Sequence, residues 1–231
     1  MSNKLGLLFP GNSKLGSQVA SFNIPRVSTC PGATKLCLKC CYVRRQDGRY
    51  PQITSSHERR YEASLKDDFA AVLSADIKNS QLKVVRIHSA GDFYSNKYIL
   101  DWVKIVRSNP DVAFYAYTRS WRLPGLLPDL EKLRRLPNMQ LWWSTDAETG
   151  EAPEGISAYL ALDDNDMPIE GTSLVLRNKR STVMKKMGGC QVCPLESGRP
   201  ELKLKLTCYK CRVCFSNALT GIKSMSSAVN S

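Results

Sequence analysis

Residues 82–118 read LKVVRIHSAGDFYSNKYILDWVKIVRSNPDVAFYAYT. Short apolar runs alternate here with a stretch of helical periodicity, and the alternation continues beyond residue 118. In chain order, we predict strand, helix, strand, helix and strand over 82–89, 96–108, 112–118, 126–136 and 139–145. Strands that alternate with helices are typical of a parallel sheet with crossover helices.

Shorter segments extend this pattern in both directions. A strand is predicted over 19–24, and strands without a clear helix between them over 159–162 and 173–176. A loop over 46–56 leads into a helix over 61–77, and Ser55 and Glu58 have the spacing of a capping box. We therefore expect an α/β fold: a partial (β/α) barrel-like parallel sheet in a domain over 1–178, followed by a small cysteine-rich metal-binding module over 179–231.

Successive residues of a strand point to opposite faces of the sheet. Val85 and Ile87 are expected on an apolar face, and Arg86 and His88 on a polar one. By the same rule the polar face includes residues in or just after two later strands. These are Tyr115, Tyr117 and Arg119 for the strand over 112–118, and Trp142, Ser144 and Asp146 for the strand over 139–145. Because ligands bind at the carboxyl ends of parallel strands, this face predicts a substrate cleft.

Nine cysteines occur among 231 residues, and they are clustered near the two ends of the chain. No stretch approaches the roughly 20 consecutive apolar residues that cross a bilayer, so we expect no membrane contact and a cytoplasmic location. Thiols stay reduced in the cytoplasm, and clustered cysteines there usually bind metal.

The N-terminal cluster supplies up to four thiols on one loop: Cys30, Cys37, Cys40 and Cys41. Three cysteines can hold three irons of a four-iron cluster and leave the fourth iron open to an outside ligand. A closed zinc site with four thiolates is the alternative. Which of Cys40 and Cys41 is a ligand stays open at this point.

The C-terminal cluster contains two paired-cysteine motifs, in which fourteen residues separate Cys193 from Cys208. Its members are Cys190, Cys193, Cys208, Cys211 and Cys214. Such pairs are a strong signature for zinc or a second iron-sulfur cluster. Either centre needs four ligands, so one of the five cysteines is spare.

The formal net charge is +12, which favours nucleic acid as a partner because neutralised phosphates release counterions. The aromatic pairs Trp142 with Trp143 and Tyr115 with Tyr117 can stack on bases, although aromatic strands more often fill cores. The oligomeric state cannot be predicted from the sequence.

Asp92, His88 and Asp146 are the candidate catalytic residues, and Gly91, Asp92 and Ser144 the candidate cofactor-binding residues. Asp92 follows a strand in a glycine-bearing turn, and the competing interpretation is a cap of the next helix. His88 has a hydrogen-bonded core histidine as its alternative. Asp146, at the end of its strand, has a turn signal as its alternative.

Three stretches resemble one known family: 22–42 with its cysteines, 86–95 (RIHSAGDFYS) and 115–120 (YAYTRS). These stretches are similar to the phage "gene product eighty-eight" family, which in turn resembles radical S-adenosylmethionine enzymes. That resemblance implies a partial barrel with a three-cysteine loop after its first strand. It also implies that Gly91 and Asp92 bind the amino group of S-adenosylmethionine. The cysteine spacing differs from that of the radical enzymes, since six residues separate Cys30 from Cys37.

The leading hypothesis is an iron-sulfur enzyme that modifies a nucleic acid or nucleobase in the cytoplasm of a bacterium or of a phage-infected cell. A second hypothesis is a base-exchange enzyme of the transglycosylase type, with Asp92 and Asp146 as base and nucleophile and with zinc at the C-terminal cysteines. A third is a non-catalytic, metal-stapled protein that binds nucleic acid or a host component.

Overall fold

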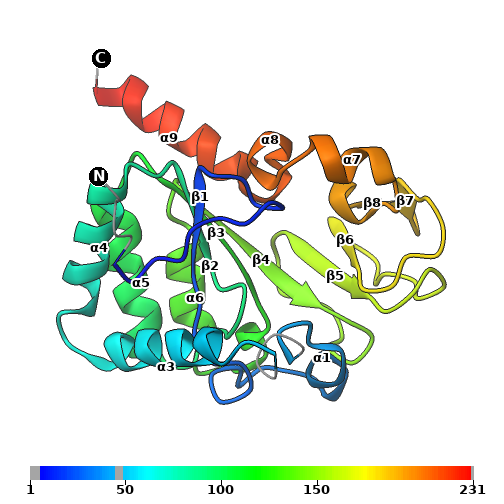
Figure 1. Cartoon of the computed structure of the whole chain (residues 1–231), viewed down its shortest axis with the longest axis horizontal. Coiled ribbons are helices and arrows are strands. Elements are labelled where there is room, and N and C mark those ends of the chain that lie inside the picture. Colours follow the sequence, from blue (N-terminus) through cyan, green and yellow to red (C-terminus); the bar gives the residue numbers. More distant parts are fainter. Residues whose placement is uncertain (1–5, 45–48, 230–231) are drawn as a thin grey trace.

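One mainly parallel sheet runs through the computed structural model, which describes residues 6–44 and 49–229 (Figure 1). The strands are β1 (Val19–Phe22), β2 (Val84–Ile87), β3 (Ala113–Thr118), β4 (Met139–Thr145), β5 (Ser157–Ala161), β6 (Leu174–Arg177), β7 (Lys186–Met187) and β8 (Cys190–Val192). The α-helices are α1 (Lys35–Cys40), α3 (Pro51–Leu65), α4 (Phe69–Ser80), α5 (Asn96–Ser108), α6 (Leu127–Arg134), α7 (Pro200–Lys205), α8 (Cys208–Cys211) and α9 (Ser216–Val229). Short 3-10 turns are η1 (Ser120–Arg122), η2 (Pro194–Glu196) and η3 (Val213–Phe215).

Strand order in the sheet is β1-β2-β3-β4-β5-β6-β8-β7. From β1 to β6 each strand pairs in parallel with the next strand of the chain, and β8 then pairs in parallel with β6. Only β7 is antiparallel among the described strands. The predicted α/β class with a parallel sheet is therefore confirmed.

One face of the sheet is covered by α4, α5 and α6 (Figure 1). Its core includes the strand residues Phe22, Ile87, Phe114 and Trp143, which pack with side chains of these helices such as Trp102. Phe22 and Trp102 meet edge to face, with ring centroids 5.5 Å apart. This helix-covered face is the apolar face that strand alternation predicts.

The opposite face is partly covered by the C-terminal segment. Tyr115 packs against Phe215 at a centroid distance of 5.5 Å, and Ala218 of α9 joins the same cluster. Gln140 donates to the carbonyl of Val213 (3.1 Å) and accepts from the amide of Asn217 (2.8 Å). The substrate cleft predicted at the carboxyl ends of the strands stays a prediction. Over β3 and β4 the C-terminal segment fills the space.

The predicted helix over 61–77 is two helices. α3 ends at Leu65 and α4 begins at Phe69, because the backbone of Lys66 is extended. The loop predicted over 46–56 lies partly outside the described residues, and from Pro51 onward it is helical. Proline suits this first helical position because the amide it lacks would have no partner there. Ser55 and Glu58 therefore lie inside α3 and form no capping box.

Residues from 179 onward contribute to the same sheet. β8 pairs with β6, and β7 pairs with β8, so the boundary predicted between 178 and 179 falls within the sheet. The helices in the described ranges include none long and apolar enough to span a membrane.

Candidate functional site

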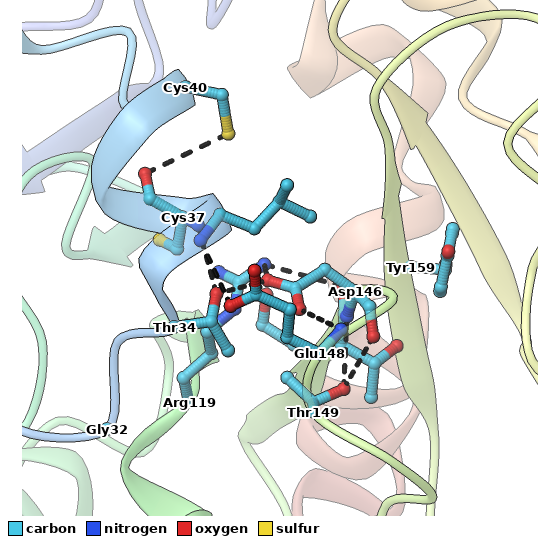
Figure 2. Close-up of polar contacts among 12 residues, drawn as sticks. Gly32, Thr34, Cys37, Cys40, Arg119, Asp146, Glu148, Thr149 and Tyr159 are labelled. Carbon is cyan, nitrogen blue, oxygen red and sulfur yellow. Dashed lines mark hydrogen bonds and ion pairs between the residues drawn. The ribbon is translucent and has the colours of Figure 1, made fainter.

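The N-terminal cysteine loop lies where the strands end, and α1 carries two of its cysteines (Figure 1). Thr34 caps this helix: its Oγ1 accepts from the amide of Cys37 at 2.9 Å. The same hydroxyl donates to Oδ2 of Asp146 at 2.7 Å (Figure 2). A single side chain therefore starts the helix and fixes it to the end of β4.

Asp146 is fully buried and anchors this junction. Its Oδ2 accepts from Nε of Arg119 at 3.1 Å, and Nη2 of Arg119 lies at the same distance from it. Its Oδ1 accepts from the amide of Glu148 at 2.9 Å, as expected of a turn aspartate (Figure 2). Both oxygens thus have protein partners, and Asp146 serves as a turn residue and as the counter-ion of Arg119.

Further contacts hold the loop against β3 and β4. Nη1 of Arg122 donates to the carbonyl of Gly32 at 2.9 Å, and the amide of Leu36 donates to Oε2 of Glu148 at 3.1 Å. A Cβ on Gly32 would overlap the carbonyl oxygen of Arg119, so only glycine allows this close approach.

The four thiols of the loop are half-buried and unpaired. Cys37 and Cys40 lie one helical turn apart, and Sγ of Cys40 donates to the carbonyl of Cys37 at 3.8 Å (Figure 2). Burial raises the pKa of Cys30 to about 12, with Asp92, Cys37 and Cys41 adding to the rise. Burial also raises the pKa of Cys37 to about 11, although Arg119 opposes the rise. Without metal the thiols of Cys30 and Cys37 are therefore protonated at neutral pH.

Asp92 links the ends of β2 and β3. Its Oδ1 accepts from Oγ1 of Thr118 (2.6 Å) and from the amide of Phe93 (2.7 Å), and its Oδ2 accepts from the amide of Arg119 (2.9 Å). Burial raises its pKa in spite of these bonds. The interpretation of Asp92 as a helix cap is wrong, because Ser95 caps α5. The amide of Asp92 also donates to the carbonyl of Thr29, the residue before Cys30, at 3.1 Å.

Gly91 is held in the left-handed region with φ +84°, and a Cβ there would overlap Ile24. Ser144 is 7% exposed, and its carbonyl accepts from Nε1 of Trp121 at 3.1 Å. Tyr115 and Trp143 are almost fully buried, which agrees with the core-filling alternative for the aromatic pairs.

His88 does not lie on the polar face with Arg86, so that prediction is wrong. The strand ends at Ile87, and a φ of +64° at His88 turns the side chain to the helix-covered face. There Nε2 of His88 lies 2.7 Å from Oη of Tyr98, and the ring meets that of Phe93 edge to face. The alternative of a hydrogen-bonded core histidine is confirmed.

Across the part of the chain that the structure describes, no three cysteine, histidine or carboxylate side chains converge as a bound ion would require. The thiol groups nonetheless suit soft metals, namely zinc and iron-sulfur clusters. Loading such a centre requires deprotonation and rotation of the thiols. The donor set of the loop therefore fits such a metal by its chemistry.

Sequence reasoning missed the residues that position the loop: Thr34, Arg122 and Glu148. Thr34 could have been identified as a helix cap, since a threonine is common immediately before the first turn of a helix. Arg119 was among the residues predicted for the polar face, but its pairing with Asp146 could not be predicted because the two residues follow different strands.

Comparison with known proteins supplies a family. The family model described as "Gene product 88" matches residues 5–217. The "Gene 88 protein" of Mycobacterium phage L5 is 31% identical over 153 residues, which are 61% of this chain and 59% of that protein. The "Gene 88 protein" of Mycobacterium phage D29 is 30% identical over 131 residues, which are 52% of this chain and 53% of that protein.

The matched region therefore spans little more than half of each of these relatives. No solved structure matches the chain significantly. The radical S-adenosylmethionine resemblance has no counterpart among these matches. The match to the family model covers most of the sequence, and this chain belongs to the Gene product 88 family.

Proposed function

We propose that this protein is an iron-sulfur enzyme of the radical S-adenosylmethionine type that modifies a nucleic acid or a nucleobase. One observation carries the proposal. Four thiols lie on a loop after β1, at the carboxyl edge of a parallel sheet whose first six strands follow chain order. Ligand sites of parallel α/β sheets lie at this edge.

Cys30, Cys37 and Cys41 are the proposed ligands. Cys37 and Cys41 both lie within electrostatic range of Cys30, whereas Cys40 is directed to the carbonyl of Cys37. A cluster held by three thiolates leaves one iron open, and that iron supplies the binding and reduction of an outside ligand.

The other residues of the site position this loop. Arg119 pairs with Asp146 and donates its amide to Asp92, so the ends of β2, β3 and β4 are held together. In this proposal Asp92 is a positioning residue, because protein donors already occupy its carboxylate. The Gly91 backbone, which lies against Ile24 and Thr29, is the proposed contact to the cofactor.

The substrate class rests on charge. A net charge of +12 favours a polyanion, and a nucleic acid or its precursor fits this sign. The proposed location is the cytoplasm of a bacterium or of a phage-infected cell, where the nine thiols stay reduced.

The experiment is anaerobic reconstitution with iron and sulfide, followed by reduction with dithionite and addition of S-adenosylmethionine. We expect a brown protein that releases methionine and 5′-deoxyadenosine. Cys37→Ser should abolish the product, whereas Cys40→Ser should retain most of it. A Leu38→Ala variant, altered at an exposed site of α1, is the matched control.

Two results would contradict the proposal. A colourless protein that holds zinc at the N-terminal cysteines favours the base-exchange enzyme or the non-catalytic protein. A brown protein that leaves S-adenosylmethionine intact rules out radical chemistry. Of the two other hypotheses, base exchange is the weaker, because the carboxylates of Asp92 and Asp146 both have protein partners.

A further inference from the structure

The five C-terminal cysteines do not all lie in the same surroundings. Cys193 is buried and packs with Trp142, and Cys208 packs against the same apolar cluster. Cys190 packs instead with Met187 and Val192 in a different cluster, and its Sγ lies 3.6 Å from the carbonyl of Gly188. The structure thus separates Cys190 from the other C-terminal thiols.

Three cysteines follow one another on a tight double turn. Cys208 and Cys211 begin and end α8, which Thr207 caps. Arg212 then adopts φ +63°, and this left-handed residue turns the chain into η3, which contains Cys214. Cys208 and Cys214 pack against one cluster, and Cys211 lies within electrostatic range of both.

Two cations face these thiols. Lys14 pairs with Glu196 at 2.8 Å and lies within electrostatic range of Cys193 and Cys208. Arg86 lies within the same range of Cys208 and Cys214, and its guanidinium lies 5.8 Å from the ring centroid of Tyr117. In the described ranges Arg86 forms no ion pair with a carboxylate.

A metal centre at these cysteines would place an anion beside Arg86. A zinc ion with four thiolates carries net negative charge, as does a four-iron cluster with four thiolates. Metal loading therefore supplies a counter-charge to Arg86 and adds negative charge near Lys14, which already pairs with Glu196.

We infer that Cys193, Cys208, Cys211 and Cys214 hold one metal centre, with Cys190 outside the ligand set. Tyr117 donates a hydrogen bond to Sγ of Cys214 at 2.9 Å and is a positioning residue for that ligand. The inference is independent of the N-terminal cluster and of its proposed chemistry.

This metal centre fastens the C-terminal segment to the sheet. Nε1 of Trp142 donates to the carbonyl of Cys214 at 3.0 Å, and Gln140 binds the neighbouring Val213. Cys214 is therefore tied to β3 and β4 through Tyr117 and Trp142. The amide of Cys208 donates to the carbonyl of Lys14 at 2.8 Å, and the amide of Cys193 donates to the carbonyl of Val175 in β6 at 2.9 Å.

The test starts from a full-length chain in which Cys30, Cys37, Cys40 and Cys41 are all serine. Metal per chain is measured after purification from medium that contains zinc and iron. We expect one C-terminal centre to remain. Cys190→Ser in this background should keep the full metal content, and Cys193→Ser or Cys211→Ser should lose most of it.

Loss of metal in Cys190→Ser, full retention in Cys193→Ser, or no metal in the starting variant would each overturn the assignment. Cobalt absorption provides a second readout in case a variant folds poorly. The charge-transfer intensity of the starting variant should correspond to four thiolates and should not change in Cys190→Ser. An intensity that corresponds to fewer thiolates contradicts the ligand set.

Tyr117→Phe tests the positioning role. Loss of a hydrogen bond to a metal ligand typically weakens metal binding by about 10-fold or more. Chelator competition should show this loss, and the cobalt charge-transfer band should shift. Tyr50→Phe, at an exposed tyrosine, is the control. Unchanged affinity and an unshifted band in Tyr117→Phe contradict the role.

Discussion

Arg119 joins three parts of the candidate site through different atoms. Its amide binds Asp92, its guanidinium pairs with Asp146, and its carbonyl lies against Gly32. Removal of one partner from such a buried pair leaves an uncompensated charge. The position of the cysteine loop therefore depends on the backbone of one residue as much as on its side chain.

Gly32→Ala tests this close approach. The new Cβ would overlap the carbonyl of Arg119, and backbone atoms cannot yield as a flexible side chain can. We expect a loss of about 1–3 kcal/mol in the free energy of unfolding, as for overpacked sites. Metal content at the N-terminal cysteines should fall as well.

Chemical denaturation and metal analysis measure the two effects. Gly125→Ala is the matched control, because a Cβ there meets nothing within 4 Å. If Gly32→Ala behaves like the control, the loop does not depend on this contact.

The protonation of His88 predicts a pH dependence of stability. Burial, followed by the charge of Arg86, lowers the pKa of His88 from 6.5 to about 3. Between these values the unfolded chain binds a proton that the folded protein does not, so the free energy of unfolding falls as the pH decreases from 6.5. Tyr98, which meets the ring, and Arg86, whose Nε donates to the carbonyl of His88, keep their protons in this range.

This dependence amounts to about 1.4 kcal/mol in the free energy of unfolding per pH unit below 6.5, and the His88→Phe variant should lack it. The variant also leaves the hydroxyl of Tyr98 without its partner, so it should be less stable at pH 7. Urea unfolding at several pH values gives both slopes. Parallel slopes for the two proteins would show that His88 takes up its proton in the folded state.

Among the elements, those with strong local periodicity could be predicted from the sequence. The structure has α5 at Asn96–Ser108 and β4 at Met139–Thr145, the same bounds as the predictions. β7 and β8 could not be predicted, because they contain two and three residues and depend on pairing with distant strands. The break between α3 and α4 was missed because apolar residues continue across it at helical spacing.

Among the site residues too, only those with a local signal in the sequence could be predicted. The cysteines and the Gly91 turn could be identified because their residue types and spacing are local signals. The partners of Asp92 and Asp146 could not, since Thr118 and Arg119 approach them from another strand. His88 was misplaced because a strict alternation assumes that the strand continues, whereas the backbone leaves the strand at that residue.

Docking of the C-terminal segment depends on Gln140, which is 4% exposed. Gln140→Leu keeps the volume but leaves the carbonyl of Val213 and the amide of Asn217 without this partner. A fully buried unsatisfied group costs about 1–3 kcal/mol, and these part-buried groups should cost less. We expect faster hydrogen exchange in η3 and in the first turns of α9, measured by mass spectrometry.

Gln191→Leu is the control, because this glutamine lies on β8 with an exposed side chain. Exchange in η3 and α9 should be unchanged in the control. Equal exchange rates in the two variants would mean that apolar packing alone holds the segment.

At the scale of the whole molecule, the net charge of +12 predicts nucleic-acid binding with a steep salt dependence. The logarithm of affinity should fall against the logarithm of salt with a slope of about 0.9 per neutralised phosphate of duplex DNA. Fluorescence anisotropy with labelled duplex and single-stranded oligonucleotides measures it.

A variant with Lys179, Lys185 and Lys186 changed to glutamine removes three exposed charges. Its slope should be smaller than that of the parent if these lysines contact phosphate. No binding at low salt, or an affinity that does not change with salt, would contradict the prediction for the whole protein.

The covering of the sheet by a distant segment also affects how the chain folds during synthesis. Tyr117 and its partner Cys214 are 97 positions apart, and Trp142 and the same cysteine 72 positions apart. The aromatic side chains of β3 and β4 therefore leave the ribosome well before the segment that covers them. Until that segment is synthesised, the nascent chain exposes an apolar, aromatic surface to which chaperones can bind.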